Sequence, residues 1–220
     1  MDKELIESLR QALTDQAASG RSAKRFRLDG FTEEEVAAML GMCYASEVER
    51  RVMQYVADTE TAAKIQKAAK WLCSDTARVG LMLYGGVGNG KSTLARAISN
   101  LIGILHNSAL SAERKNVYRL TAIELAKLAT ENQPLFDQVR RQELLMIDDV
   151  GTEQVSVKVW GNEYSPVTEV LYDRYDRQLF TLATSNLSDE EMRERYGIRI
   201  YDRMEEMFDR LYYKQPSYRK

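Results

Sequence analysis

Cysteine and histidine are scarce in this sequence. Its 220 residues contain two cysteines, Cys43 and Cys73, and one histidine, His106. The cysteines are far apart and belong to no paired motif, which favours reduced thiols over a disulfide or a redox pair. His106 follows an apolar stretch and has no zinc-ligand spacing around it, so we interpret it as a helix residue. These absences exclude a disulfide scaffold and predict no zinc site.

Long apolar runs and a strong charge of one sign are also missing. The N-terminus, Met1 to Glu4, lacks the apolar segment of a signal peptide, and no run is long enough to span a bilayer. We therefore expect a cytoplasmic protein. The net charge of −2 provides no overall positive field, so any contact with DNA would need a local basic patch.

The first part of the chain, residues 1–75, contains only helical patterns. Apolar residues recur at helical spacing from Ile6 to Leu13. Thr32 with Glu35 forms a capping-box pattern, which predicts a helix from Thr32 to about Leu40. Further helices are predicted over 46–57 and from Thr59 onward.

From Arg78 the pattern changes to short apolar strands that alternate with helices. Strands are predicted at 79–84, 116–121, 144–147 and 180–184, with helices over about 91–106, 122–141 and 165–177. Alternation of this kind is typical of an α/β fold, a parallel sheet with helices on both faces. The length suits one such domain with a smaller region attached.

A glycine-rich segment follows the first predicted strand and matches the phosphate-loop pattern G-x-x-x-x-G-K-[ST]. Glycines let successive backbone N–H groups point at phosphate oxygens, and the helix that follows presents its positive end to the same anion. Lys91 would reach the β- and γ-phosphates of ATP, and the Ser92 hydroxyl would bind Mg²⁺. The predicted nucleotide-binding residues are Gly85, Gly86, Val87, Gly88, Asn89, Gly90, Lys91, Ser92 and Thr93.

Two carboxylates follow the predicted strand at 144–147. At the carboxyl end of a parallel strand, Asp148 and Asp149 would face the ligand crevice. Asp148 can hold magnesium through water, and Asp149 can polarise the attacking water. The alternative interpretation is a simple polar exit from the strand.

Asn186 ends the next predicted strand and is placed to contact the γ-phosphate or to orient water. Arg199 and Arg203 follow, four residues apart and thus on one helical face. Either arginine can be an ordinary surface charge. In this chain order, however, at least one is predicted to be an arginine finger that reaches a neighbouring subunit's nucleotide, with Arg203 favoured.

Over about residues 60–220 the sequence resembles the DnaC/DnaI helicase loaders of the AAA+ ATPase class. IstB-type transposition helper ATPases share the same order of motifs. The segments that carry the resemblance are Gly-Gly-Val-Gly-Asn-Gly-Lys-Ser-Thr (85–93), Leu-Met-Ile-Asp-Asp-Val-Gly (145–151), Tyr-Asp-Arg-Tyr (172–175), Thr-Ser-Asn-Leu-Ser (184–188), Gly-Ile-Arg-Ile-Tyr-Asp-Arg-Met (197–204) and Ser-Tyr-Arg (217–219).

The resemblance implies a two-part organisation: a helical partner-binding region at 1–58 and an AAA+ ATPase domain at 59–220. Its members bind ATP at subunit interfaces, contact single-stranded DNA and grip a replicative helicase through the N-terminal region. Asp149 stands where many AAA+ proteins have glutamate, which suits a slow switch. Few residues follow Arg203, so little or no helical lid is expected. Arg219 resembles a terminal arginine of these loaders, and a solvated tail is the alternative.

Three alternative functions remain open from the sequence. A transposition helper would form filaments on duplex DNA, with a steep dependence of binding on salt. A small-molecule kinase would need an acceptor-substrate pocket and an arginine-rich lid, which the run Thr-Ser-Asn-Leu disfavours. A nucleotide-gated interaction module would bind ATP and barely hydrolyse it.

Overall fold

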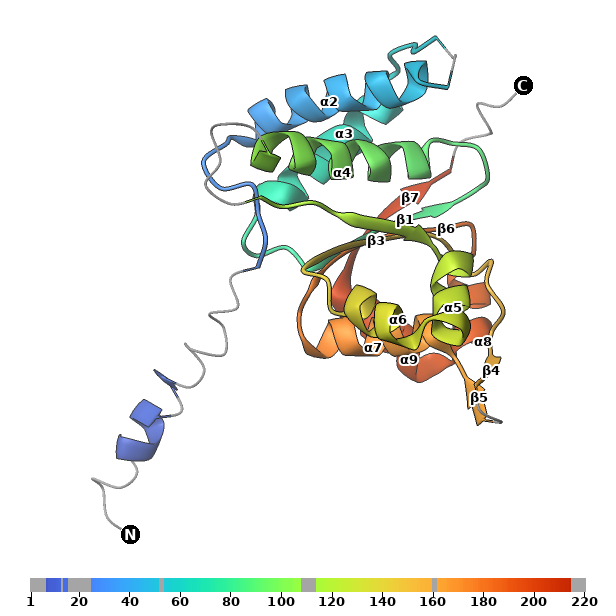
Figure 1. Cartoon of the computed structure of the whole chain (residues 1–220). Coiled ribbons are helices and arrows are strands. Elements are labelled where there is room, and N and C mark those ends of the chain that lie inside the picture. The colour runs from blue at the N-terminus through green and yellow to red at the C-terminus, as the bar shows by residue number, and fades with distance from the viewer. Residues whose placement is uncertain are drawn as a thin grey trace.

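Five parallel strands form the central sheet of this protein (Figure 1). The computed structural model describes residues 7–12, 14–15, 25–51, 54–107, 114–159 and 162–214. The sheet has the order β2-β3-β6-β1-β7. Its strands are β1 (Gly80–Gly85), β2 (Tyr118–Thr121), β3 (Leu144–Val150), β6 (Phe180–Ser185) and β7 (Phe208–Tyr213). The predicted parallel sheet is confirmed, with β7 as a strand that the sequence analysis did not find.

Helices cover both faces of the sheet, which makes its strands apolar on both sides. In β1, Leu81 and Leu83 pack into one core, and Met82 between them packs into the other. Alternate side chains of a strand point to opposite faces, so a strand buried on both faces must be apolar throughout. This explains the continuous apolar runs in the sequence and confirms the α/β class.

One face of the sheet carries α2 (Glu33–Glu49), α3 (Thr59–Cys73) and α4 (Lys91–Asn107) (Figure 1). The capping box at Thr32 is present, as predicted. The prediction of two helices, over 32–40 and 46–57, is wrong, because α2 continues as one helix to Glu49. Leu40 and Tyr44 are both buried one turn apart, and this packing outweighs the cost of about 1 kcal/mol for Gly41 inside a helix.

The opposite face carries α5 (Ala122–Glu131), α6 (Gln133–Arg140), α7 (Pro166–Asp176), α8 (Asp189–Tyr196) and α9 (Ile198–Met207). The single helix predicted over 122–141 is in fact two. Asn132 ends α5 and caps α6, accepting a hydrogen bond from the Leu135 N–H at 3.1 Å. Pro134 at the start of α6 lacks an N–H group, so it cannot continue the preceding helix.

A hairpin of β4 (Val157–Val159) and β5 (Asn162–Tyr164) follows β3. After α9 the chain returns to the sheet as β7, paired with β1, so residues 208–213 form a strand and not a lid helix. Within the described ranges, no helix is both long and apolar enough to cross a membrane.

Within residues 1–58, the described segment from Arg25 onward packs against the rest of the domain, whereas residues 7–12 and 14–15 are exposed. Phe26 and Leu28 are buried in the same core as α3 and α4. Arg27 is also buried, and its guanidinium donates hydrogen bonds to the carbonyl oxygens of Ser74 at 2.7 Å and Ala77 at 3.0 Å. The proposed boundary between residues 58 and 59 therefore divides two regions that share a core, and it remains a proposal about their roles.

Candidate nucleotide site

The segment between β1 and α4 has the backbone shape of a phosphate loop. Gly85, Gly88 and Gly90 have φ angles of 121°, 77° and 92°, a region that other residues rarely adopt. A Cβ atom at Gly85 would lie 2.3 Å from the Tyr213 carbonyl oxygen. At Gly90 it would lie 2.5 Å from the Tyr44 hydroxyl. The Gly85 position therefore requires glycine for conformation and for space, and the Gly90 position requires it for conformation.

Lys91, the first residue of α4, is buried and folds back onto this loop. Its Nζ donates hydrogen bonds to the carbonyl oxygens of Gly85 at 2.8 Å and Gly86 at 2.5 Å, and to Asn89 Oδ1 at 3.1 Å. The Asn89 amide in turn donates to the Tyr213 carbonyl at 3.4 Å. A phosphate in the loop would offer this ammonium charged oxygens in place of the three neutral ones.

Asp148 and Asp149 lie in a β-bulge at the end of β3. Ile147 pairs with Ala183 and Val150 with Ser185, so β3 has one more residue than β6 between these pairs. The buried Thr184 hydroxyl faces the bulge. It donates to Asp148 Oδ1 at 2.6 Å and accepts from the Asp149 N–H at 2.8 Å. Asp149 consequently has a φ of 57°, which is uncommon for a residue other than glycine.

The bulge places the two carboxylates in different surroundings. Asp148 is buried, and its Oδ2 lies 3.1 Å from Nη2 of Arg96 on α4. Asp149 is half-buried and lines a cavity together with the phosphate loop. The two adjacent acids, for which the sequence predicts different roles, therefore differ in burial and in the groups around them.

A cavity of about 510 Å³ joins many of the predicted site residues, but Gly85, Gly86 and the buried Asp148 do not line it. Residues 87–93, Asp149 and Asn186 line it. A second wall comes from the end of α2, the loop after it and the start of α3. Sequence reasoning missed this wall, because no motif marks the segment and α2 was divided in two. The missed residues are Tyr44, Val48, Arg51, Gln54, Tyr55, Val56, Asp58 and Thr61.

The two predicted finger arginines do not line this cavity. Arg203 is a residue of α9, and its side chain contacts α7. Its guanidinium carbon lies 4.1 Å from the centre of the Tyr172 ring, and its Nη1 lies 3.6 Å from Asp176 Oδ1. Arg199 is exposed in the first turn of α9. The third arginine named in the sequence analysis, Arg219, lies outside the described residues, as does the segment 217–219 that contains it.

The residues present fit a nucleotide triphosphate with a magnesium ion. Three glycines with positive φ shape the loop, and the start of α4 presents its N–H groups there. Ser92 and Asp148 would supply hydroxyl and carboxylate oxygens, the donors that magnesium prefers. The donor set and the loop geometry therefore agree.

The fold and the loop together define an α/β core with a glycine-rich loop between its strand β1 and helix α4. A search of solved structures finds the DnaC helicase loader, with a TM-score of 0.55 and 18% identity, over 73% of this chain and 93% of that chain. It also finds DnaI, with a TM-score of 0.51 and 20% identity, over 72% and 87%. Identities this low show a shared fold alone. No protein-family model matches the sequence, and a search of the curated proteins finds no match either.

Proposed function

We propose that this protein is an ATP-dependent helicase loader, an ATPase that binds and hydrolyses ATP at subunit interfaces and places a replicative helicase on single-stranded DNA. The observation that carries the proposal is the cavity shared by the phosphate loop, Asp149 and Asn186 on a core with the fold of the DnaC helicase loader. Fold likeness and site chemistry support the same class of activity, a nucleotide-driven assembly.

The chemistry follows from where each group lies. Lys91 and the loop N–H groups bind the phosphates, and Ser92 and Asp148 would hold magnesium, which neutralises phosphate charge. Asp149 lines the cavity and accepts a hydrogen bond from, or a proton of, the attacking water. Asn186, on the neighbouring strand end, orients this water or senses the γ-phosphate.

The second wall of the cavity connects ATP to the proposed partner-binding region. Tyr44 and Tyr55 belong to residues 1–58 and line the same cavity as Lys91. Their rings pack edge to face with centroids 5.8 Å apart. A nucleotide that fills the cavity therefore touches both proposed regions, so ATP can change how residues 1–58 present themselves to a helicase.

The proposal is tested with the full chain as bait, because a fragment ending at residue 75 would expose the apolar face of α2 that packs on α4 and leave α3 without β7. Pull-down with ATP, with ADP and without nucleotide should recover a ring helicase most strongly with ATP. Fluorescence anisotropy with labelled single- and double-stranded oligonucleotides should show preference for single strands. Absence of any helicase, with tight and strongly salt-dependent binding to duplex DNA, would indicate a transposition helper instead.

The two acids should respond differently to loss of charge. Asp149→Asn should leave binding of ATP and magnesium unchanged and slow hydrolysis by about 10²- to 10⁴-fold, because an amide is a poor proton acceptor. Asp148→Asn should mainly raise the magnesium concentration needed for nucleotide binding. Magnesium titrations of a fluorescent ATP analogue, combined with phosphate-release assays, separate the effects. Identical magnesium curves for both variants would contradict the division of roles.

A further inference from the structure

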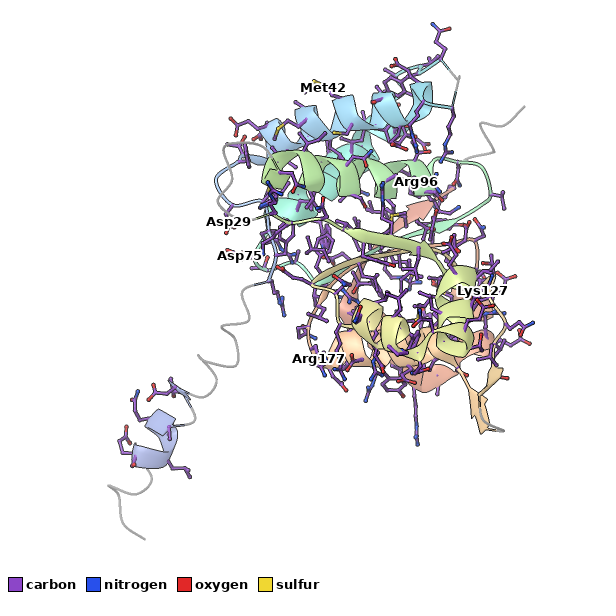
Figure 2. All side chains as sticks on the ribbon, viewed as in Figure 1. Asp29, Met42, Asp75, Arg96, Lys127 and Arg177 are labelled. Atoms are coloured by element: carbon purple, nitrogen blue, oxygen red, sulfur yellow. The ribbon has the colours of Figure 1, made fainter. Side chains whose placement is uncertain are left out.

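The basic side chain of Arg96 lies next to Asp148, one of the two proposed magnesium ligands. Ser92 and Arg96 are four residues apart on α4, so their side chains share one face of the helix about 5–6 Å apart. Figure 2 shows Arg96 projecting from α4 toward the sheet. There its Nη2 lies 3.1 Å from Asp148 Oδ2. The phosphate-loop motif does not include this residue.

Both oxygens of the Asp148 carboxylate therefore have partners within the protein. Oδ1 accepts the Thr184 hydroxyl at 2.6 Å and Oδ2 accepts the Arg96 guanidinium. The Asp148 side chain is only 7% exposed, whereas that of Arg96 is 33% exposed. Asp148 is thus fixed by the sheet, and Arg96 is the partner that can move toward solvent.

We propose that Arg96 is a positioning residue that holds Asp148 in the magnesium-free site and sets the magnesium concentration at which ATP binds. This inference rests on the proposed ATP site. When magnesium is absent, the guanidinium supplies the positive charge that a buried carboxylate needs. A magnesium ion held by Ser92 and Asp148 would repel the guanidinium, so Arg96 would share or leave Oδ2.

Because Arg96 and magnesium compete for Asp148, the direction in which loss of the Arg96 charge changes magnesium binding can be stated. Removing the charge of Arg96 removes repulsion toward the incoming dication, so magnesium should bind more tightly. The same change leaves the Asp148 carboxylate without its counter-charge when the metal is absent, so the metal-free protein should become less stable. A merely structural ion pair predicts the loss of stability and no change in magnesium dependence. The magnesium dependence therefore distinguishes the two roles.

The variants are Arg96→Gln, which removes the charge and retains N–H donors, and Arg96→Lys, which retains the charge. Arg119→Gln is the matched control. Arg119 lies on β2 and donates a hydrogen bond to Asn100 Oδ1 at 3.0 Å. Asn100 is on α4, one turn after Arg96, so this pair resembles the Arg96–Asp148 pair without involving Asp148. Each full-length protein is titrated with magnesium at a fixed concentration of a fluorescent ATP analogue. Thermal unfolding is measured in EDTA without nucleotide.

For Arg96→Gln we expect the magnesium midpoint to fall by about two- to fivefold, the scale of a partly exposed ion pair, with a lower Tm in EDTA. Arg96→Lys and Arg119→Gln should keep the wild-type midpoint. An unchanged or raised midpoint for Arg96→Gln, in a protein that still binds the analogue, overturns the role of Arg96. Wild-type protein that binds no analogue at any magnesium concentration overturns the proposed ATP site itself.

Discussion

Replacing Lys91 with alanine should weaken ATP binding by about ten- to hundredfold, the range expected when charge-assisted hydrogen bonds are lost. The ammonium is the one cation of the phosphate loop, and it lies buried at the start of α4, where the helix end also favours an anion. Equilibrium titration with a fluorescent ATP analogue measures the loss. Unchanged affinity would contradict the phosphate-loop assignment.

The control for this variant must address the hydrogen bonds that Lys91 makes within the loop. Lys91→Ala removes the donor that joins the carbonyl oxygens of Gly85 and Gly86, so the loop itself can change. Thermal unfolding without nucleotide shows whether the fold persists. Lys127→Ala, an exposed lysine on α5 (Figure 2), should bind ATP as the unchanged protein does.

The phosphate loop and the ends of two strands were predictable because their signals are local. The spacing of the phosphate-loop pattern is enough to find Gly90 and Lys91 in the sequence. Asp149 and Asn186 each end a short apolar run, and the carboxyl ends of parallel strands in one sheet lie along the same edge. We therefore expect Gly90, Lys91, Asp149 and Asn186 to lie near one another, and one cavity is lined by all four.

Other parts of the site depend on contacts that no local pattern encodes. The bulge at Asp148 and Asp149 arises from pairing with β6, where Thr184 bonds to both residues. The wall that includes Tyr44 and Tyr55 depends on how α2 packs on α4. Sequence spacing cannot reveal either feature; in the bulge, for example, Thr184 is 36 residues from Asp148 and 35 from Asp149.

Strand β7 was missed for a related reason. Its residues, Phe208–Tyr213, include charged side chains at Asp209 and Arg210, so the segment lacks the uniform apolar character of the other strands. β7 is an edge strand, and Arg210 lies over the ring of Tyr84 at 4.4 Å from its centre. An edge strand can carry such side chains because one of its sides faces no other strand.

An arginine finger should give the second large effect, and Arg203 is our proposed finger. Its guanidinium does not line the cavity of its own chain and lies among Tyr172, Tyr175 and Asp176. A neighbouring subunit packed against α7 and α9 would bring its nucleotide to this surface. Arginine suits the role because its planar fork stays charged and binds two phosphate oxygens at once.

The surroundings of Arg203 and Arg199 distinguish the two candidates. Arg203 lies in the middle of α9 and is held by an aromatic ring and a carboxylate, so little rotamer freedom is lost when it meets a phosphate. Arg199 lies in the exposed first turn, where helix ends fray. Preorganisation therefore favours Arg203, and Arg199 serves as the matched comparison.

Arg203→Ala should bind ATP normally and fail to hydrolyse it in the assembly, with a loss approaching the 10³- to 10⁵-fold range of known fingers, or less in a slow switch. Mixing it with Lys91→Ala should restore part of the activity, because some interfaces then combine an intact phosphate loop with an intact arginine. Arg203→Lys, which retains a charge near Tyr172, shows whether loss of packing alone explains the result. Full activity for Arg203→Ala, with loss and recovery for Arg199→Ala, would assign the finger to Arg199.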